Sequence, residues 1–165
     1  LLENKYDFEL RILGPIELYE LTPFTDRKYI KKYGALNQHE LALELKNSNA
    51  FLFAFINPPC PNSVLEAIST GLPIVSINYG SLNELLSFNT KLLSPCLKDS
   101  DRLIKGPNDH NIEDLSCRIE TLINNYDQHR ALALENANRF NFEICGNEYV
   151  NIITNVENRF LSGER

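Results

Sequence analysis

Residues 50–75, AFLFAFINPPCPNSVLEAISTGLPIV, decide the fold of this chain. The apolar run at 50–56 shows no alternation, which is typical of a strand buried on both faces. A proline-rich loop follows, and residues 62–70 have the apolar spacing of a helix. Gly71 suits the left-handed position that ends such a helix, with Pro73 just beyond it. Because residues 73–77 then begin a second apolar strand, the stretch predicts a strand–helix–strand unit.

Similar units flank this stretch on both sides. Upstream, residues 7–14 predict a strand that stops at Gly14, residues 28–33 a short strand that ends at Gly34, and residues 38–48 an amphipathic helix. Downstream, residues 80–87 predict a short helix, residues 91–93 predict a strand, and residues 102–104 predict a further short strand at the edge of the sheet. Strands that alternate with helices at this spacing favour an α/β fold, a Rossmann-like parallel sheet with helices on both faces.

The last third of the chain is expected to be helical. Apolar residues mark one face of a helix at 112–123, and a shorter helix is expected around 131–137. A terminal helix carries an apolar stripe made of Cys145, Tyr149, Ile152, Ile153, Val156 and Phe160. We expect the stripe to pack on the core or on a domain outside this chain. The domains are therefore expected at 1–140, the Rossmann-like part, and at 141–165, the C-terminal helix.

Composition and charge exclude several classes of protein. The chain has 165 residues, is 43% hydrophobic and carries a formal net charge of −6, which is unlike the basic footprint of a nucleic-acid binder. Its longest apolar run is far shorter than the roughly 20 residues that span a bilayer. The four cysteines and three histidines are scattered and form no metal-binding pattern. We therefore expect reduced thiols, no metal, no cofactor and no nucleic-acid partner. Since the chain contains no methionine, we also expect it to be part of a longer protein.

The loop and helix start after residue 56 form the candidate binding site. The first amides of a helix have no partner within it, and they carry its positive end, so this loop suits a phosphate or diphosphate. Glu66, one turn into the helix, is placed to accept hydrogen bonds from sugar or ribose hydroxyls. The alternative is structural, because Ser63 and Glu66 match the S-x-x-E pattern of a capping box. Ser81 and Glu84 match the same pattern, and there we favour capping.

Residues 59–86, PCPNSVLEAISTGLPIVSINYGSLNELL, resemble the hallmark region of the group 1 (family-four) retaining glycosyltransferases of the GT-B fold. The shared order is (P)N-x-x-L-E-A-x-x-x-G-L-P-x-V followed by G-x-x-E-L, and the resemblance continues through nearly the whole chain. It implies that this domain binds the donor, a nucleotide-diphosphate sugar linked to UDP or GDP. It also implies sugar transfer with retention of configuration in polysaccharide or glycan synthesis. An acceptor domain, absent from this chain, would complete the enzyme, a hexosyltransferase, and this chain alone is expected to bind the donor without transferring sugar.

The resemblance also implies roles for particular residues. Glu66 would bind the ribose hydroxyls, and the backbone amides of Ser63, Val64 and Leu65 would face the diphosphate. The turn at Gly34, Ala35 and Leu36 would lie near the base. The loop residues Cys60 and Pro61 and the helix start at Asn62 belong to the same implied donor site. No catalytic residue is identified in the chain.

Two departures from the family pattern leave alternatives open. Pro58 stands where the family has a second acid that faces the donor sugar. The family's first strand, with its diphosphate-binding Arg and Lys, would precede Leu1. One alternative is therefore a non-catalytic nucleotide-sugar-binding module, and a further one is another GT-B enzyme such as a nucleotide-sugar epimerase. The resemblance implies a cytoplasmic protein that meets the inner face of the membrane through the absent domain.

Overall fold

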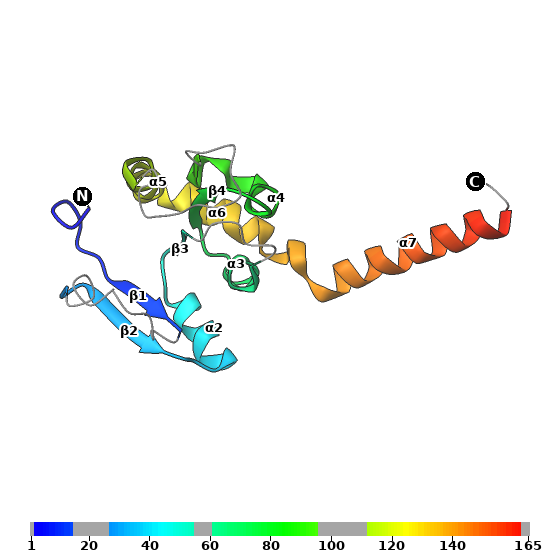
Figure 1. Cartoon of the computed structure of the whole chain (residues 1–165), viewed down its shortest axis with the longest axis horizontal. Coiled ribbons are helices and arrows are strands. Elements are labelled where there is room, and N and C mark those ends of the chain that lie inside the picture. Colours follow the sequence, from blue (N-terminus) through cyan, green and yellow to red (C-terminus); the bar gives the residue numbers. More distant parts are fainter. Residues whose placement is uncertain (1, 15–26, 55–60, 96–111, 163–165) are drawn as a thin grey trace.

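The computed structural model of the chain describes residues 2–14, 27–54, 61–95 and 112–162 (Figure 1). Pro58, Cys60 and the short edge strand expected at 102–104 lie outside these residues. The described strands are parallel throughout and fall into two sheets. This confirms the predicted parallel α/β character but corrects the expectation of one sheet.

The first sheet consists of β1 (Leu10–Leu13) and β2 (Ile30–Gly34). The strands run parallel, with Leu10 opposite Ile30, and the amide of Gly14 donates to the carbonyl of Gly34 at 2.7 Å. Both glycines have positive φ, 114° at Gly14 and 66° at Gly34, a backbone conformation that costs other residues energy. The predicted strand ends at Gly14 and Gly34 are therefore confirmed.

The second sheet has the order β3 (Phe51–Phe53), β4 (Ile74–Asn78), β5 (Leu93–Pro95). Strand β4 is buried along most of its length, whereas β3 is not: Leu52 is 42% exposed. The prediction that this apolar run is buried on both faces is therefore wrong for its described part. The physical reason is that β3 has only one neighbour, β4, among the described strands.

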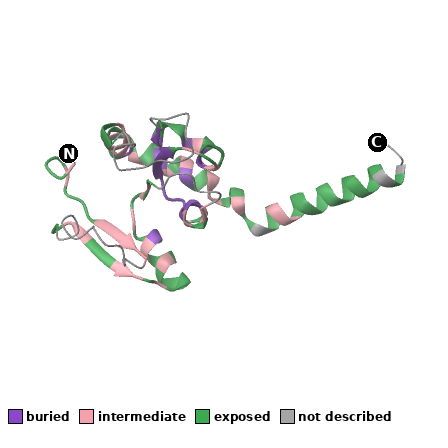
Figure 2. Ribbon diagram, viewed as in Figure 1, coloured by how far each residue is buried: buried purple, intermediate pink, exposed green. Residues whose placement is uncertain are grey.

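Helices cover both faces of this second sheet. Successive side chains of a strand point to opposite faces, and Ile74 packs in one core cluster with α3 (Asn62–Ser69) whereas Val75 packs in another with α5 (Ile112–Asn124). Figure 2 shows the buried residues gathered around β4 and the helices next to it. The remaining helices are α2 (Gln38–Lys46), α4 (Leu82–Leu85), the 3₁₀ helices η1 (Ser87–Leu92) and η3 (Ala137–Phe140), α6 (Tyr126–Asn136) and α7 (Phe142–Ser162).

The end of α3 follows a Schellman motif. The amide of Gly71 donates to the carbonyl of Ile68 at 2.8 Å, and that of Leu72 donates to Ala67 at 3.2 Å. Gly71 has a φ of 69°, as the sequence predicted from its position after the helix. This motif stops α3 and turns the chain directly into β4.

Helix α7 leaves the body of the molecule and extends away from it (Figure 1). Its large apolar side chains are exposed, so the expectation that the stripe packs on the core is wrong. The exposed apolar residues are Ile144, Tyr149, Val150, Ile152, Ile153, Val156 and Leu161. No described helix is long and apolar enough to cross a membrane.

A buried polar pair joins α6 to η1. His129 is 2% exposed, and its Nδ1 lies 3.0 Å from Oδ1 of Asn89, which is also buried. Since Asn89 Oδ1 can only accept, the neutral imidazole donates its Nδ1 proton. Burial lowers the pKa of His129 below its usual value, and nearby Lys91 lowers the pKa further.

This pair predicts a loss of stability in mild acid. Because the unfolded His129 titrates near about 6.5 and the folded one at a lower pKa, the unfolded state binds more protons as the pH falls through this range. We expect the free energy of unfolding in urea to fall between about pH 7.5 and 5.5. The variant His129→Gln, which keeps a donor for Asn89 but does not titrate, should show a flatter profile. The exposed His39 provides the matched control, and equal profiles for His39→Gln and His129→Gln would contradict the prediction.

Candidate functional site

The carboxyl ends of the strands mark where a ligand is expected. In open α/β sheets, ligands bind beyond these ends, where the strand order reverses direction. Here the described strands form two sheets that share no hydrogen-bonded pair, β1–β2 and β3–β4–β5. The rule therefore indicates the carboxyl ends of these strands, near Gly14 and Gly34 and after Phe53.

A cavity of about 490 Å³ opens at this place, and we call it the β1–α3 cavity. It brings together three of the residues predicted for the donor site, Leu36, Ser63 and Glu66, although they come from two segments far apart in the sequence. Its lining combines mostly apolar side chains of strands and helices with a few polar ones; the full set is Leu10, Arg11, Ile12, Leu13, Gly14, Leu36, Leu41, Leu45, Ser48, Phe51, Leu52, Phe53, Ser63 and Glu66.

The start of α3 leaves two backbone amides available. Pro61 is the N-cap residue and forms no side-chain cap hydrogen bond. The amides of Val64 and Leu65 donate to the carbonyl of Pro61, at 3.0 and 3.3 Å. The amides of Asn62 and Ser63 have no acceptor among the described residues. Of the three amides predicted to face a diphosphate, only that of Ser63 is therefore available, and Asn62 adds a second.

Neither predicted capping box is formed. Ser63 is the second residue of α3 rather than its N-cap, so the capping role considered for Glu66 is wrong. Ser81 does precede α4, but no side-chain hydrogen bond caps that helix, so the capping predicted for Ser81 with Glu84 is wrong too.

Glu66 is exposed, and its carboxylate has no hydrogen bond or ion pair among the described residues. It also borders a smaller hollow of about 210 Å³ between α2 and α3. The Glu66 carboxylate therefore neither caps α3 nor forms an ion pair with the described residues, and it is available to a ligand.

The other described residues predicted for the donor site do not line the β1–α3 cavity. The side chain of Val64 is fully buried in the core, and Leu65 packs against the same core. Gly34 and Ala35 lie beside the cavity, in the turn that leads to Leu36, but do not line it. Asn62 is exposed. Pro61 is the N-cap residue of α3, and Cys60 lies outside the described residues.

Arg11 is a lining residue that the sequence reasoning did not identify. Its guanidinium pairs with Glu9 at 2.7 Å and with Glu44 at 2.9 Å. The hydrogen bond to Glu9 raises the pKa of Arg11 above its already high usual value, so it is a permanent cation. Among the described lining residues it is the only basic one. Its position within a strand pattern of alternating residues gave no signal that it lies at the site.

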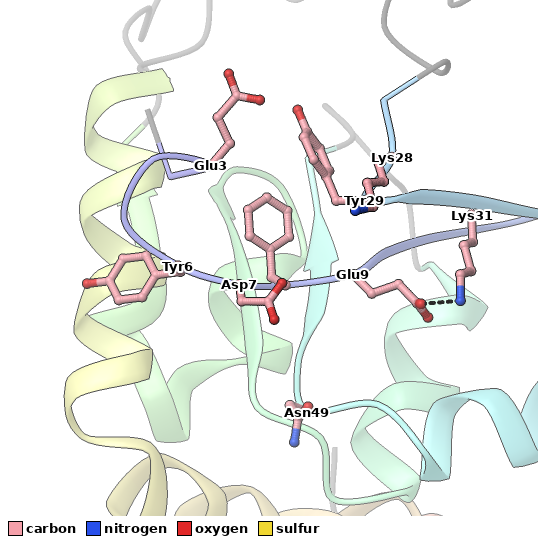
Figure 3. Close-up of a pocket in the computed structure, with 9 residues that line it drawn as sticks. Glu3, Tyr6, Asp7, Glu9, Lys28, Tyr29, Lys31 and Asn49 are labelled. Atoms are coloured by element: carbon pink, nitrogen blue, oxygen red, sulfur yellow. Dashed lines mark ion pairs between the residues drawn. The ribbon is translucent and has the colours of Figure 1, made fainter.

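A second cavity, of about 670 Å³, lies at the opposite end of β1 and β2 (Figure 3). Its charged side chains are partly paired, since Lys31 Nζ lies 2.5 Å from Glu9 Oε2. Hydrogen bonds from Lys31 and Arg11 lower the pKa of Glu9. Because this cavity lies at the amino ends of the strands, it does not fit the ligand rule for such sheets. Lys31 and Lys32 lie in β2, which pairs with β1 alone among the described strands.

The part of the chain that the structure describes holds no group of three or more His, Cys, Asp or Glu side chains placed to bind a metal ion. The chemistry available at the β1–α3 cavity is therefore that of helix amides, one free carboxylate and mostly apolar side chains. Groups of these kinds suit an anionic, hydroxyl-bearing ligand, and none of the described lining residues is a nucleophile held by a base.

Comparison with known proteins identifies a family for the chain. Residues 1–140 match the family model described as glycosyl transferases group 1. Neither a curated protein nor a solved structure matches the chain. The family match includes β1, β2, α3 and every described residue that lines the β1–α3 cavity. This chain belongs to the group 1 glycosyl transferases.

Proposed function

We propose that the chain binds the nucleotide-diphosphate sugar donor of a glycosyl transfer reaction in the β1–α3 cavity. One observation carries the proposal: Glu66, Ser63 and Leu36 line one cavity, together with residues of β1 and β3. The family resemblance implies a donor role for the same three residues. The donor would carry UDP or GDP, the acceptor would be a growing glycan or polysaccharide, and transfer would retain configuration.

The diphosphate is expected at the start of α3. The amides of Asn62 and Ser63 lack described acceptors, and they stand at the positive end of the helix. As the sugar leaves, negative charge builds up on the diphosphate. Donors that are already oriented toward this charge stabilise it without reorganisation. The chain would therefore contribute electrostatic stabilisation rather than a general base.

The nucleoside is expected further along the same cavity. The unpaired carboxylate of Glu66 suits the two ribose hydroxyls, since hydrogen bonds to a charged acceptor are stronger than neutral ones. Leu36 presents an apolar side chain from the turn after β2, where a base would pack. This order, with phosphate at the helix start and ribose one turn away, matches the separation of Ser63 and Glu66 along α3.

Glu66→Ala is expected to weaken nucleotide binding by about 10- to 100-fold, because hydrogen bonds to a charged group contribute about 1.5–3 kcal/mol. The measurement is calorimetric titration of the chain with UDP, GDP and ADP. The control is Glu135→Ala, which makes the same change at an exposed helical position that lines none of the cavities described above. Equal loss of affinity in both variants, or none in Glu66→Ala, would contradict the role of Glu66. Saturable binding of one nucleotide would also identify the donor base.

A second candidate is a binding module that does not transfer sugar. The observation that favours it is Pro58, which replaces the acid expected to face the donor sugar. Incubating the full-length protein with the radiolabelled sugar donor of the nucleotide that binds separates the two candidates. Label that moves to a glycan or to water supports a transferase site. Unchanged donor, recovered under conditions of saturated binding, supports the binding module.

A further inference from the structure

Helix α7 carries an apolar stripe that the described part of the chain leaves uncovered. The helix has 21 residues, extends from the body of the molecule, and makes its main contact with η3, which directly precedes it (Figure 1). Tyr149 is 69% exposed, Ile153 64% and Val156 62%. Isolated helices are only marginally stable in water, and helices in proteins are held mainly by packing of their apolar face. The stripe of α7 therefore needs a partner surface.

The face of α7 opposite the stripe is polar. With 3.6 residues per turn, the stripe residues of the middle of the helix fall within about 100° of its circumference; they are Cys145, Tyr149, Ile152, Ile153 and Val156. Between Asn147 and Asn158 the opposite face consists of uncharged polar side chains, which are Asn147, Asn151, Thr154, Asn155 and Asn158. Such a helix packs against one surface along its length and keeps its other side in water.

The charged side chains that flank the stripe fit a second copy of α7. Glu148 and Arg159 are eleven residues apart, about three helical turns, so both lie on the same flank of the stripe. When two such helices pair antiparallel, this flank of one copy meets the same flank of the other. With Ile152 and Ile153 at the centre, Glu148 of each copy lies nearly level with Arg159 of the other. Opposite charges in these flanking positions set the partner and its direction.

A parallel pair of α7 helices fits less well. Because α7 begins at the body of the molecule and extends away from it, a parallel pair would bring two bodies to the same end (Figure 1). It would also align the two helix dipoles, whereas an antiparallel pair opposes them. In a parallel pair opposite flanks meet, so Arg159 would face Glu157 of the other copy and Glu148 would face no charge.

We propose that two copies of this chain pair through α7, as an antiparallel seam in which Glu148 and Arg159 form reciprocal ion pairs. A helix of 21 residues gives a seam of about 32 Å, at 1.5 Å per residue. The two apolar stripes bury each other, and both polar faces stay in water. The inference is independent of the donor role, because no described residue of α7 lines the β1–α3 cavity.

Sedimentation equilibrium of the full chain at micromolar concentration tests the seam, and we expect a dimer. Ile152→Asp puts an unpaired charge into the seam and should weaken dimerisation at least about 100-fold. Because Ile152 is exposed, this change leaves the core intact. The matched control Asn151→Asp adds the same charge on the polar face and should remain a dimer. Equal effects in the two variants would overturn α7 as the seam. A monomeric unmodified chain would overturn the dimer and leave the stripe to another domain.

Exchange of the flanking charges tests the direction of the pair. Glu148→Arg and Arg159→Glu, each alone, should weaken dimerisation by about 10-fold, since like charges then meet at both ends of the seam. The double variant should recover the affinity of the unmodified chain, because the reciprocal pairs form again with their charges exchanged. An unchanged affinity in Glu148→Arg, with a double variant as weak as Arg159→Glu, is the result of a parallel pair and would overturn the antiparallel arrangement.

Discussion

Ile68→Ala is expected to lower the free energy of unfolding by about 3 kcal/mol, within the range for truncating a buried isoleucine. Ile68 is 1% exposed and lies on the inner face of α3, in the core cluster that α3 shares with α2, α4 and β4. The lost methyl and methylene groups would leave a void that this tightly packed cluster can only partly close. Urea unfolding followed by circular dichroism measures the change as a shift of the midpoint at constant slope.

The opposite face of α3 provides the control. Glu66→Ala, two residues away and exposed, should change the free energy of unfolding by less than about 0.5 kcal/mol. Ile68→Val, which removes one carbon atom, should cost about 1 kcal/mol. A loss as large in Glu66→Ala as in Ile68→Ala would mean that Glu66 holds the fold. The proposal that its carboxylate is kept for a ligand would then fail.

The separation of these two faces was largely predictable from sequence. The buried residues Val64, Ala67 and Ile68 follow the helical period, and Gly71 ends the helix as its position indicates. The parallel strands and their order along the chain followed from the alternation of apolar runs with helical patterns. The α/β pattern does not predict that Ser63 and Glu66 share a cavity with Leu36, because this depends on how distant segments pack in three dimensions.

The capping predictions failed for a backbone reason. A side-chain cap requires an N-cap residue in the extended region of φ and ψ. At α3 this position is held by Pro61, with φ −76° and ψ 111°, which places Ser63 inside the helix. Ser81 has φ −67° and ψ −12°, a helical conformation in which its hydroxyl does not cap α4. The capping box that does form, between Asn37 and Glu40, carries the same type of signal in N-x-x-E.

The burial of apolar runs was the least predictable feature. The apolar residues of β3 and the apolar stripe of α7 favour burial of these segments, but the pattern does not show which part of the protein would cover them. In the structure, β3 has one described neighbour and α7 extends from the body with its apolar residues exposed. Burial depends on the neighbouring strand or surface, which is a property of the assembly rather than of the segment.

Gly71→Ala is expected to cost about 2–3 kcal/mol. Two effects add: the φ of 69° disfavours any side chain by about 1–2 kcal/mol, and a Cβ atom would lie 2.6 Å from Cδ2 of Leu134 in α6. Gly34→Ala is the matched control, because its φ of 66° is nearly the same but no atom lies within 4 Å of the added Cβ. It should cost only about 1 kcal/mol, since alanine also restricts the unfolded chain. Urea unfolding of both variants gives the difference.

The double variant with Leu134→Ala isolates the contact. Leu134 is 52% exposed, so truncating it should cost little by itself, yet it removes the atoms that the new Cβ would meet. In that background the cost of Gly71→Ala should fall to the value measured for Gly34→Ala, a coupling of about 1–2 kcal/mol between the two positions. If the cost is unchanged, backbone strain alone explains the glycine, and α6 does not limit what can follow α3. If it falls as expected, the α3–α6 contact requires glycine in the turn that sets the position of the helix carrying Ser63 and Glu66.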